Sequence, residues 1–534
     1  MRHRIPKSLR QHWKLPVALI AFVVIVASVF GATRVRPYIT GDASIIASEI
    51  TENITGTVDL FDTSVTHELS IAISDAEYDD MISTFRKSGD KKWVNADVVI
   101  DGIRIEDASV RLKGNSTLTG VRGTDFAEMA PEGIELPEGF DPAQGPPGMG
   151  GTISQADPED PTSLPLLISF DENAEGRAYQ GMTELSVRPG SPVLNEAMAL
   201  SLTAETDQPT QRYAYTVYSV NDSATTTRLV LEHPDDTYAN SLFDSNGYLY
   251  KADASSRLEY VGDDQSSYSG QFKQINAVGT GNLQPLINFS RWLDSASDEE
   301  FAARLGEWVD VDSFARYLAT QNLLVNGDDM AGPGQNYYLW YDLDTEKLSV
   351  ISWDLNLAMQ GDATLGPHDS VSMGPGGMGP GGPGGPGGPG MGQGAMSGGA
   401  DSAPATAPDG GAGGGPGGFP QGMPRLPGGG PEGMPGIQGE TPEGMPGGGQ
   451  APPQIGNTLK TRFLESEAFT AMYEDAYRQL HEQIYGSGRA LEILDEVSAS
   501  VSTSDGLTAE SLQGSVEAMR SWIEERITAL DDLR

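Results

Sequence analysis

Two groups of acidic and amide residues in the second half of the chain have the side chains of a metal-dependent site. The first is the run Asn326–Asp329, and Asn336 follows Asp328 by eight residues. The second is Asp354, which follows the apolar run LSVIS and Trp353. Oxygen donors of this kind bind hard divalent cations. A cation held by Asn336 and Asp354, with Asp328 orienting a hydroxyl group, would suit phosphoryl transfer.

The same residue types also have a plain structural explanation. Asp and Asn are common in turns, because their short polar side chains hydrogen-bond to the nearby backbone. The spacing of the two groups therefore leaves two interpretations open, a cation site and a pair of turns without a ligand.

Alternating apolar residues predict the strands that would position these two groups. The pattern occurs in residues 67–74, 93–112, 164–170, 183–189, 213–221 and 227–233. A turn at Asp101-Gly102 divides the second of these stretches. The strands are interrupted by helical patterns, so the sequence predicts an α+β fold rather than an all-β protein.

Three helical patterns accompany the strands. One covers residues 191–206, where Ser191 can cap the helix and Pro192 suits its first turn. A second, over residues 311–325, leads into the first acidic group. The last helix of the chain carries one apolar stripe that predicts docking onto a core, made of Val516, Met519, Ile523, Ile527 and Leu530.

Composition and charge exclude several classes of protein. Lys and Arg number 34 and Asp and Glu number 75, which gives a net charge of −41. Because this charge repels phosphate backbones, we expect no nucleic-acid partner. The chain contains no Cys, which excludes disulfides, thiolate metal sites and a Cys nucleophile.

The N-terminal region has the pattern of a membrane anchor. Residues 1–14 form a basic tail without an acid, and residues 15–32 carry no charge. At roughly 1.5 Å per residue the second stretch is about 27 Å long as a helix, enough to cross a bilayer. The basic flank predicts a single-pass protein of the cell membrane, with residues 33–60 as a stalk and an extracellular main domain. A cleaved signal peptide, which would release a secreted protein, is the alternative.

Two Gly/Pro-rich stretches interrupt the folded part. They cover residues 120–163 and 373–455, and the second repeats the sequence PEGMPG. Because their apolar content is too low to offset the entropy of ordering, we expect both to be disordered insertions. The expected organisation is one domain over residues 61–372, which contains the first insertion, completed by a helical part over residues 456–534.

Several motifs carry a family resemblance. VRLKGNST, SVRPGSPVLNEAMALSL, LVLEHPDD with GYLYKAD, NGDD with NYYLWYD, and VISWDLN occur in the order seen in the spore-coat H-type (CotH) kinases, and WIEERI resembles their last helix. The resemblance implies a bilobal, atypical protein-kinase-like fold. It also implies transfer of the ATP γ-phosphate, with Mg²⁺, to Ser or Thr of a surface or coat protein. By resemblance Asp328 is the catalytic residue, and Asn336 and Asp354 hold the metal.

Comparison with protein kinases also suggests which residues contact the nucleotide. Arg188 stands where kinases place a phosphate-binding Lys, and Glu196 stands where that Lys finds its carboxylate partner. Glu232 ends a strand where kinases pair with adenine, and Trp353 can stack on the base. Simpler explanations are also open: Arg188 as a surface charge, Glu196 as a solvated helix residue, and Trp353 as a core aromatic.

Two residues depart from the family pattern. Ser352 stands before Trp353 where the family often has Pro, and Asn356 stands where it often has a second Asp. Asn356 can still offer an oxygen, but with less charge, so the affinity for a metal could fall. The alternative function is a catalytically inactive, kinase-like cell-surface adhesion or envelope structural protein.

Overall fold

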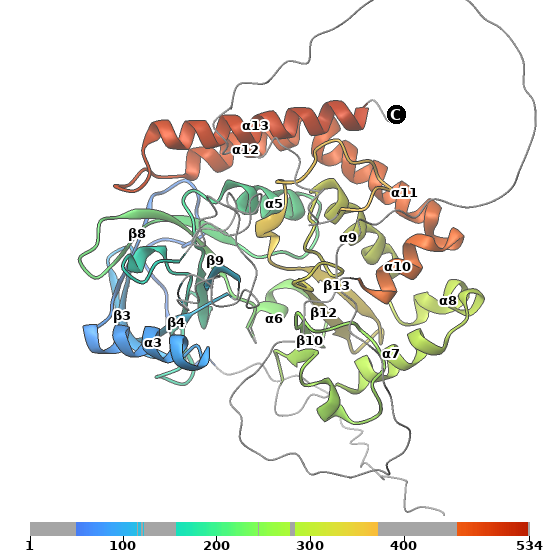
Figure 1. The fold of residues 1–534 in the computed structure, drawn as a ribbon, viewed down its shortest axis with the longest axis horizontal. Helices are drawn as coiled ribbons and strands as arrows, with labels where there is room; N and C mark the ends of the chain where they lie inside the picture. Colours follow the sequence, from blue (N-terminus) through green and yellow to red (C-terminus); the bar gives the residue numbers. More distant parts are fainter. Residues whose placement is uncertain are drawn as a thin grey trace, which may run out of the picture.

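The computed structural model describes residues 50–114, 116–118, 121, 156–235, 237–243, 245–277, 283–371 and 456–531. They form a closed barrel, a four-stranded antiparallel sheet, a two-stranded ribbon and helices that lie mainly around the second sheet (Figure 1). Buried apolar side chains make one large cluster within the barrel and another among the second sheet and the helices. The predicted mixture of strands and helices is therefore confirmed.

The barrel accounts for the strand patterns of the first half of the chain. Its strands, in order around the barrel, are β2 (His67–Ala72), β3 (Val94–Ile100), β4 (Ile103–Leu112), β5 (Leu166–Ser169), β7 (Glu184–Val187), β9 (Thr226–Glu232) and β8 (Tyr213–Val220). Neighbours are antiparallel except β2 and β8, whose parallel pairing closes the barrel. The predicted turn between β3 and β4 is present, with φ of 50° at Asp101 and 79° at Gly102.

The second sheet explains why the two acidic groups meet. Its strands run in the order β11 (Phe272–Gln274), β10 (Gly247–Ala252), β12 (Tyr337–Asp342) and β13 (Leu348–Ser352). The antiparallel register pairs Tyr337 with Ser352. The chain enters β12 and leaves β13 at this same end of the sheet. The loop with Asp328 and the turn with Asp354 therefore lie side by side.

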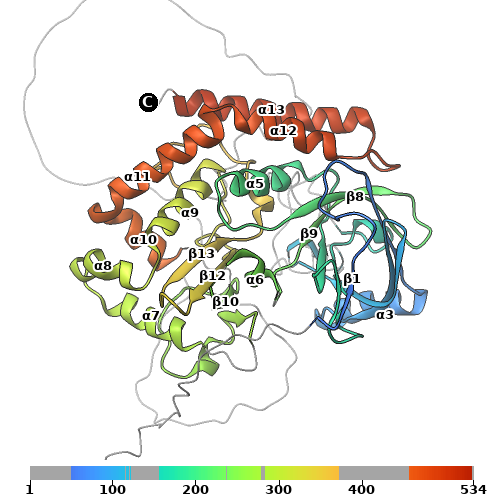
Figure 2. The ribbon, with the colours of Figure 1, turned by 180° about the vertical axis from the view of Figure 1, so that it is seen from behind.

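Helices cover the second sheet and extend across to the barrel. They are α3 (Asp75–Ser88), α5 (Leu194–Glu205), α6 (Tyr238–Leu242), α7 (Gln284–Ser295), α8 (Asp298–Arg304), α9 (Val311–Leu323), α10 (Thr458–Glu465), α11 (Glu467–His481), α12 (Arg489–Ser500) and α13 (Ala509–Asp531). α3 lies against the barrel, whereas α12 and α13 lie side by side along one edge of the molecule and contact α5 (Figure 2). The predicted apolar stripe of the last helix is confirmed, because Met519, Ile523 and Leu530 are buried.

The start of α5 differs from the prediction. The helix begins at Leu194, after Val193, whose φ of −95° and ψ of 75° are not helical. Ser191 therefore lies too early in the chain to cap the helix, and no side chain caps its N-terminus. The N-cap and first-turn assignments of Ser191 and Pro192 were wrong.

The folded region is also wider than the predicted domain boundaries. β1 (Glu52–Ile54) pairs in parallel with β6 (Arg177–Tyr179), and Leu60 is buried, so part of the expected stalk belongs to the fold. Val121 and Ala156 are buried as well, so both ends of the first expected insertion pack on the barrel. Residues 122–155 and 372–455, which hold the rest of the two expected insertions, lie outside the described residues.

The expected membrane location needs a correction. In the described part of the chain, no helix has both the length and the apolar composition needed to cross a bilayer. This finding stands against the expected single-pass location at a cell membrane, which we do not retain. The anchor expected at residues 15–32 itself lies outside the described residues.

Candidate active site

The loop that follows α9 presents Asp328 in a tightly held position. The Gly334 backbone N–H donates to Asp328 Oδ1 at 2.6 Å, and Asn336 Nδ2 donates to Asp328 Oδ2 at 2.9 Å. A Cβ atom on Gly334 would lie 2.6 Å from Asp328 Oδ2, so a larger residue there would displace the carboxylate. The loop thus fixes both oxygens of a side chain that is only 8% exposed.

The neighbouring acid, Asp329, has a different environment. Its side chain is 4% exposed, and its Oδ2 forms an ion pair with Lys460 of α10. Its Oδ1 accepts the backbone N–H of Ala331 at 2.9 Å. Asp329 therefore attaches the loop to the C-terminal helices, and its charge is compensated where that of Asp328 is not.

Asp354 lies in the turn that follows β13, and the residues after it pack against α5. Its backbone is left-handed, with φ of 53°, and Asn195 of α5 holds the turn by donating to the carbonyl of Asn356 at 2.6 Å. Asp354 Oδ1 accepts from Arg188 Nη2 at 2.5 Å. Arg188 also pairs with Glu196, because the Nε of Arg188 donates to the Oε1 of Glu196 at 3.0 Å. The structure thus brings three predicted site residues, Arg188, Glu196 and Asp354, into one ion-pair network.

The burial of Arg188 and Glu196 excludes the simpler explanations, a surface charge and a solvated helix residue. Arg188 is 9% exposed and Glu196 is 0% exposed, so neither is a solvated surface group. Burial raises the pKa of Glu196, and the charge of Arg188 only partly offsets that effect. Arg188 remains charged, because Asp354 and Glu196 together raise its pKa against the effect of burial.

The two aspartates have opposite pKa shifts. Burial, together with the nearby charges of Asp354 and Asp329, raises the pKa of Asp328 to about 6. Burial also disfavours the charged form of Asp354, but Arg188 and Lys113 outweigh it and hold the pKa of Asp354 below its ordinary value. The pairing of Tyr337 with Ser352 places the segments that carry the two aspartates at the same end of the second sheet. Such a divergence separates a proton acceptor from a permanently charged ligand.

Basic side chains converge on Trp353, which directly precedes Asp354. Lys113, just beyond the end of β4, lies 5.1 Å from the centroid of the Trp353 ring, and Lys251 of β10 lies 4.9 Å from it. Burial lowers the pKa of both lysines, and nearby cations add to this effect, chiefly Arg188 at Lys113 and Lys273 at Lys251, although Asp354 opposes it. In a chain with a net charge of −41, this concentration of cations is a local anion-attracting region.

His233 completes this cationic region as a neutral ring. Burial and the surrounding cations, Lys113 first among them, lower its pKa well below the ordinary value. Its Nδ1 lies 3.2 Å from both Lys113 Nζ and Ser186 Oγ. Its Nε2 lies 3.5 Å from Glu184 Oε2.

Glu232 and Trp353, which were predicted to contact the nucleotide, are both in contact with other side chains of the protein. Arg212 Nη2 donates to Glu232 Oε1 at 2.8 Å, and the Glu232 backbone N–H donates to the Arg212 carbonyl at 3.0 Å. Glu232 thus lies outside the network around Asp354. Trp353 is buried among Lys113, Lys251 and His233, as the core-aromatic explanation expected. Contact of either residue with a nucleotide stays a prediction.

The side-chain oxygens of Asp354 and Asn336 are of the type that binds hard cations. Asp354 offers the oxygen that Arg188 does not occupy, and Asn336 donates through Nδ2, which leaves its Oδ1 as the atom that can face a cation. Among the described residues, no group of three or more His, Asp or Glu side chains could hold a metal.

Sequence analysis did not find the convergence of Lys113, Lys251 and His233. Local patterns carry no signal for it, because these residues come from the barrel and from the second sheet. Only the packing of these two parts brings them together.

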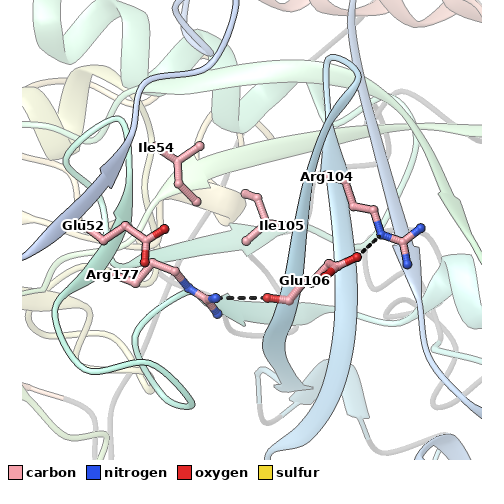
Figure 3. A pocket seen from close by; sticks show the side chains of 6 residues that line it. All are labelled: Glu52, Ile54, Arg104, Ile105, Glu106 and Arg177. Carbon is pink, nitrogen blue, oxygen red and sulfur yellow. Dashed lines mark hydrogen bonds and ion pairs between the residues drawn. The ribbon is translucent and has the colours of Figure 1, made fainter.

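A separate hollow lies nearer the other end of β4. It is lined by Glu52, Ile54, Arg104, Ile105, Glu106 and Arg177 (Figure 3). Arg177 Nη1 donates to the carbonyl of Glu106 at 3.0 Å, and Arg104 pairs with the Glu106 side chain at 3.3 Å. None of the predicted site residues lines this hollow, so it is not part of the candidate active site.

Comparison with known proteins bears on the region that holds the site. No curated protein matches the chain. A family model described as CotH kinase protein matches residues 166–388, which contain Arg188, Glu196, Asp328 and Asp354. The match indicates a kinase-like function, and kinases in general use ATP with a metal ion. The resemblance drawn from the motifs is thereby confirmed over residues 166–388, which are similar to the CotH kinase family.

Proposed function

We propose that this chain is an ATP-dependent kinase that transfers the γ-phosphate to a Ser or Thr hydroxyl group of a protein. The observation that carries the proposal is the meeting of Asp328 and Asp354 beside a cluster of basic side chains. The acids come from two loops of the second sheet, and Lys113 and Arg188 come from the barrel side. The barrel and the second sheet with its helices would then act as the two lobes of a kinase-like fold.

In this proposal Asp328 is the proton acceptor. As the substrate hydroxyl oxygen bonds to the γ-phosphorus, the bond from that phosphorus to the oxygen of the departing ADP breaks, and the proton passes to the Asp328 carboxylate. Gly334 and Asn336 hold that carboxylate in a fixed orientation. A pKa of about 6 leaves Asp328 ionised at neutral pH and still basic enough to accept a proton.

The remaining residues would bind the nucleotide. Mg²⁺ held by Asp354 and Asn336 would neutralise charge on the phosphates. Lys113, Lys251 and Arg188 supply positive charge beside Asp354 for the phosphate oxygens. Following the family resemblance, the proposed acceptors are surface or coat proteins, and the net charge of −41 favours acceptor segments that are basic.

The test is transfer from γ-labelled ATP with Mg²⁺ to basic Ser/Thr peptides. The variants are Asp328→Asn and Asp354→Ala, and the control is Asp79→Asn, an exposed aspartate on α3. We expect label on Ser or Thr with the wild type and with the control, and loss of label with both site variants. Equal transfer by wild type and Asp328→Asn would overturn the role of Asp328.

One observation favours a second candidate, a kinase-like protein that binds nucleotide without transferring phosphate. Arg188 already neutralises Asp354, and Asn356 supplies no second charge near it. Calorimetric titration with ATP in the presence of Mg²⁺ or Mn²⁺ separates the candidates. Tight binding without transfer to any peptide supports the second, whereas binding with transfer excludes it.

A further inference from the structure

Arg526 of α13 is buried in an unusual environment. Its side chain is 0% exposed, and its guanidinium donates to four backbone carbonyls. Nε donates to the carbonyl of Leu323 at 3.3 Å and Nη2 to that of Asn322 at 3.0 Å. Nη1 donates to the carbonyl of Ala363 at 3.0 Å and also to that of Leu365. Burying a charged guanidinium group costs free energy unless its donors are satisfied, and here the carbonyls satisfy them. We therefore expect Arg526 to have a structural role.

Two of the acceptors are the last carbonyls of α9. Carbonyls at a helix C-terminus lack partners within the helix and carry partial negative charge. Arg526 supplies both the donors and the positive charge, and the hydroxyl of Tyr485 adds a bond to Leu323 at 3.0 Å. The end of α9 is therefore fixed just before the chain enters the loop with Asp328.

The other two acceptors follow Asp354 in the chain. The segment with Ala363 and Leu365 continues from the turn that holds Asp354, and Trp522 of α13 donates to the Gly361 carbonyl at 2.9 Å. The two segments also contact each other directly, because the Met359 N–H donates to the Leu324 carbonyl at 2.7 Å. One face of α13 thus touches both acid-bearing segments.

We propose that Arg526 is a positioning residue that sets the separation between Asp328 and Asp354. One planar guanidinium joins the segment before Asp328 to the segment after Asp354, so the two carboxylates are held as one unit. This inference rests on the proposed kinase function for its catalytic consequence, but the joining of the two segments does not depend on it.

The geometry predicts that lysine cannot replace Arg526. A guanidinium presents five N–H donors in one plane, whereas an ammonium group is a single point with three donors. Arg526→Lys keeps the charge but cannot reach both pairs of carbonyls. Arg526→Met removes the charge and all the bonds while keeping a long side chain.

The experiment compares Arg526→Lys, Arg526→Met and Ile523→Ala with the wild-type full chain. Ile523 lies on the same helix and is equally buried, but it belongs to the apolar core. Hydrogen–deuterium exchange is followed in residues 322–336 and 355–365, and kcat and KM are measured below the melting temperature of every variant. Ile523→Ala controls for general loosening of α13.

We expect both arginine variants to raise exchange in the two segments together. We expect kcat to fall by about 10–100-fold with KM for ATP changed less than about threefold, because small misplacements of reacting groups are costly. Ile523→Ala should lower the melting temperature without this joint change in exchange or the fall in kcat.

Three results would overturn the inference: faster exchange in one segment alone, unchanged exchange in Arg526→Lys, or the same fall in kcat with Ile523→Ala. If the wild type transfers no phosphate, the proposed function fails while exchange still decides whether Arg526 joins the segments. Should Arg526→Met not fold, Arg526→Lys carries the same comparison.

Discussion

The loop after α9 and the turn after β13 each contribute one aspartate to the end of the second sheet, yet the surroundings of the two differ. Asp328 receives neutral donors from Gly334 and Asn336 and faces other acids, so its pKa rises to about 6. Asp354 faces Arg188 and Lys113, which hold its pKa below the ordinary value despite burial. The surroundings therefore shift the pKa values of two identical side chains in opposite directions.

The difference shows how chemistry can be divided between the two loops. A carboxylate whose pKa lies near working pH can accept a proton, whereas one surrounded by cations stays charged and can serve as an anchor for a cation. The barrel side supplies Arg188 and Lys113, whereas the second sheet supplies the two aspartates and Lys251. Asymmetry between the aspartates therefore depends on how these two parts pack together.

Removal of the charged aspartate should have the largest effect. We expect Asp354→Ala to lower transfer by about 10³-fold or more, since a bound metal ion contributes several kcal/mol to phosphoryl transfer. Mg²⁺-dependent ATP binding should fall in parallel, as measured by calorimetry. Full Mg²⁺-dependent binding in this variant would remove Asp354 from the ligand set.

Loss of the cation that holds Asp354 should destabilise the protein. Arg188→Met leaves Glu196, which is 0% exposed, without its partner, and we expect the free energy of unfolding to fall by about 3–5 kcal/mol. Denaturant titration measures the change. Adding Glu196→Gln should restore much of the loss, and a double variant no more stable than Arg188→Met would show that the pair is not coupled.

The pairing of Asp329 provides a comparison within the first loop. Lys460→Met leaves the buried Asp329 carboxylate uncompensated, so we expect a loss of about 2–3 kcal/mol, reduced because Lys460 is partly exposed. Lys460→Arg keeps the charge and should lose far less. Comparable losses in the two variants would mean that packing, rather than charge, attaches the loop to α10.

Asp328→Asn should give the smallest change in stability, and in the opposite direction. The folded-state pKa of Asp328 is raised from 3.8 to about 6, so the native state binds more protons in that pH window and stability falls as pH rises through it. A neutral Asn avoids this cost. We expect a gain of about 1–3 kcal/mol at pH 7.5 that disappears below about pH 4. A gain that does not depend on pH would contradict the raised pKa.

Part of this arrangement could be predicted from the sequence. The strands β12 and β13 are short and antiparallel, and Asn336 and Asp354 lie just outside their open end, so a hairpin alone brings the two acidic groups together. The turn at Asp101-Gly102 and the helix before Asp328 follow from equally local patterns. The start of α5 did not, because Ser191 and Pro192 carry helix-start signals although the helix begins at Leu194.

Other parts depend on contacts between distant segments. Lys113 and Lys251 meet at Trp353 only through the packing of the barrel against the second sheet. Arg526 lies beside an apolar stripe, where a charged residue usually marks the edge facing water. Its burial is explained by four backbone carbonyls, those of Asn322 and Leu323 at the end of α9 and those of Ala363 and Leu365, which accept its N–H groups.

The most direct test of the account is the pH dependence of phosphate transfer by the wild type and by Asp328→Asn, from pH 4.5 to 8.5 under single-turnover conditions. The wild-type rate should rise tenfold per pH unit below about pH 6 and level off above it, because the ionised form of Asp328 accepts the proton. The rate of Asp328→Asn should be about 10²–10⁴-fold lower and should lose this dependence. An unchanged profile at an unchanged rate in the variant would contradict the account.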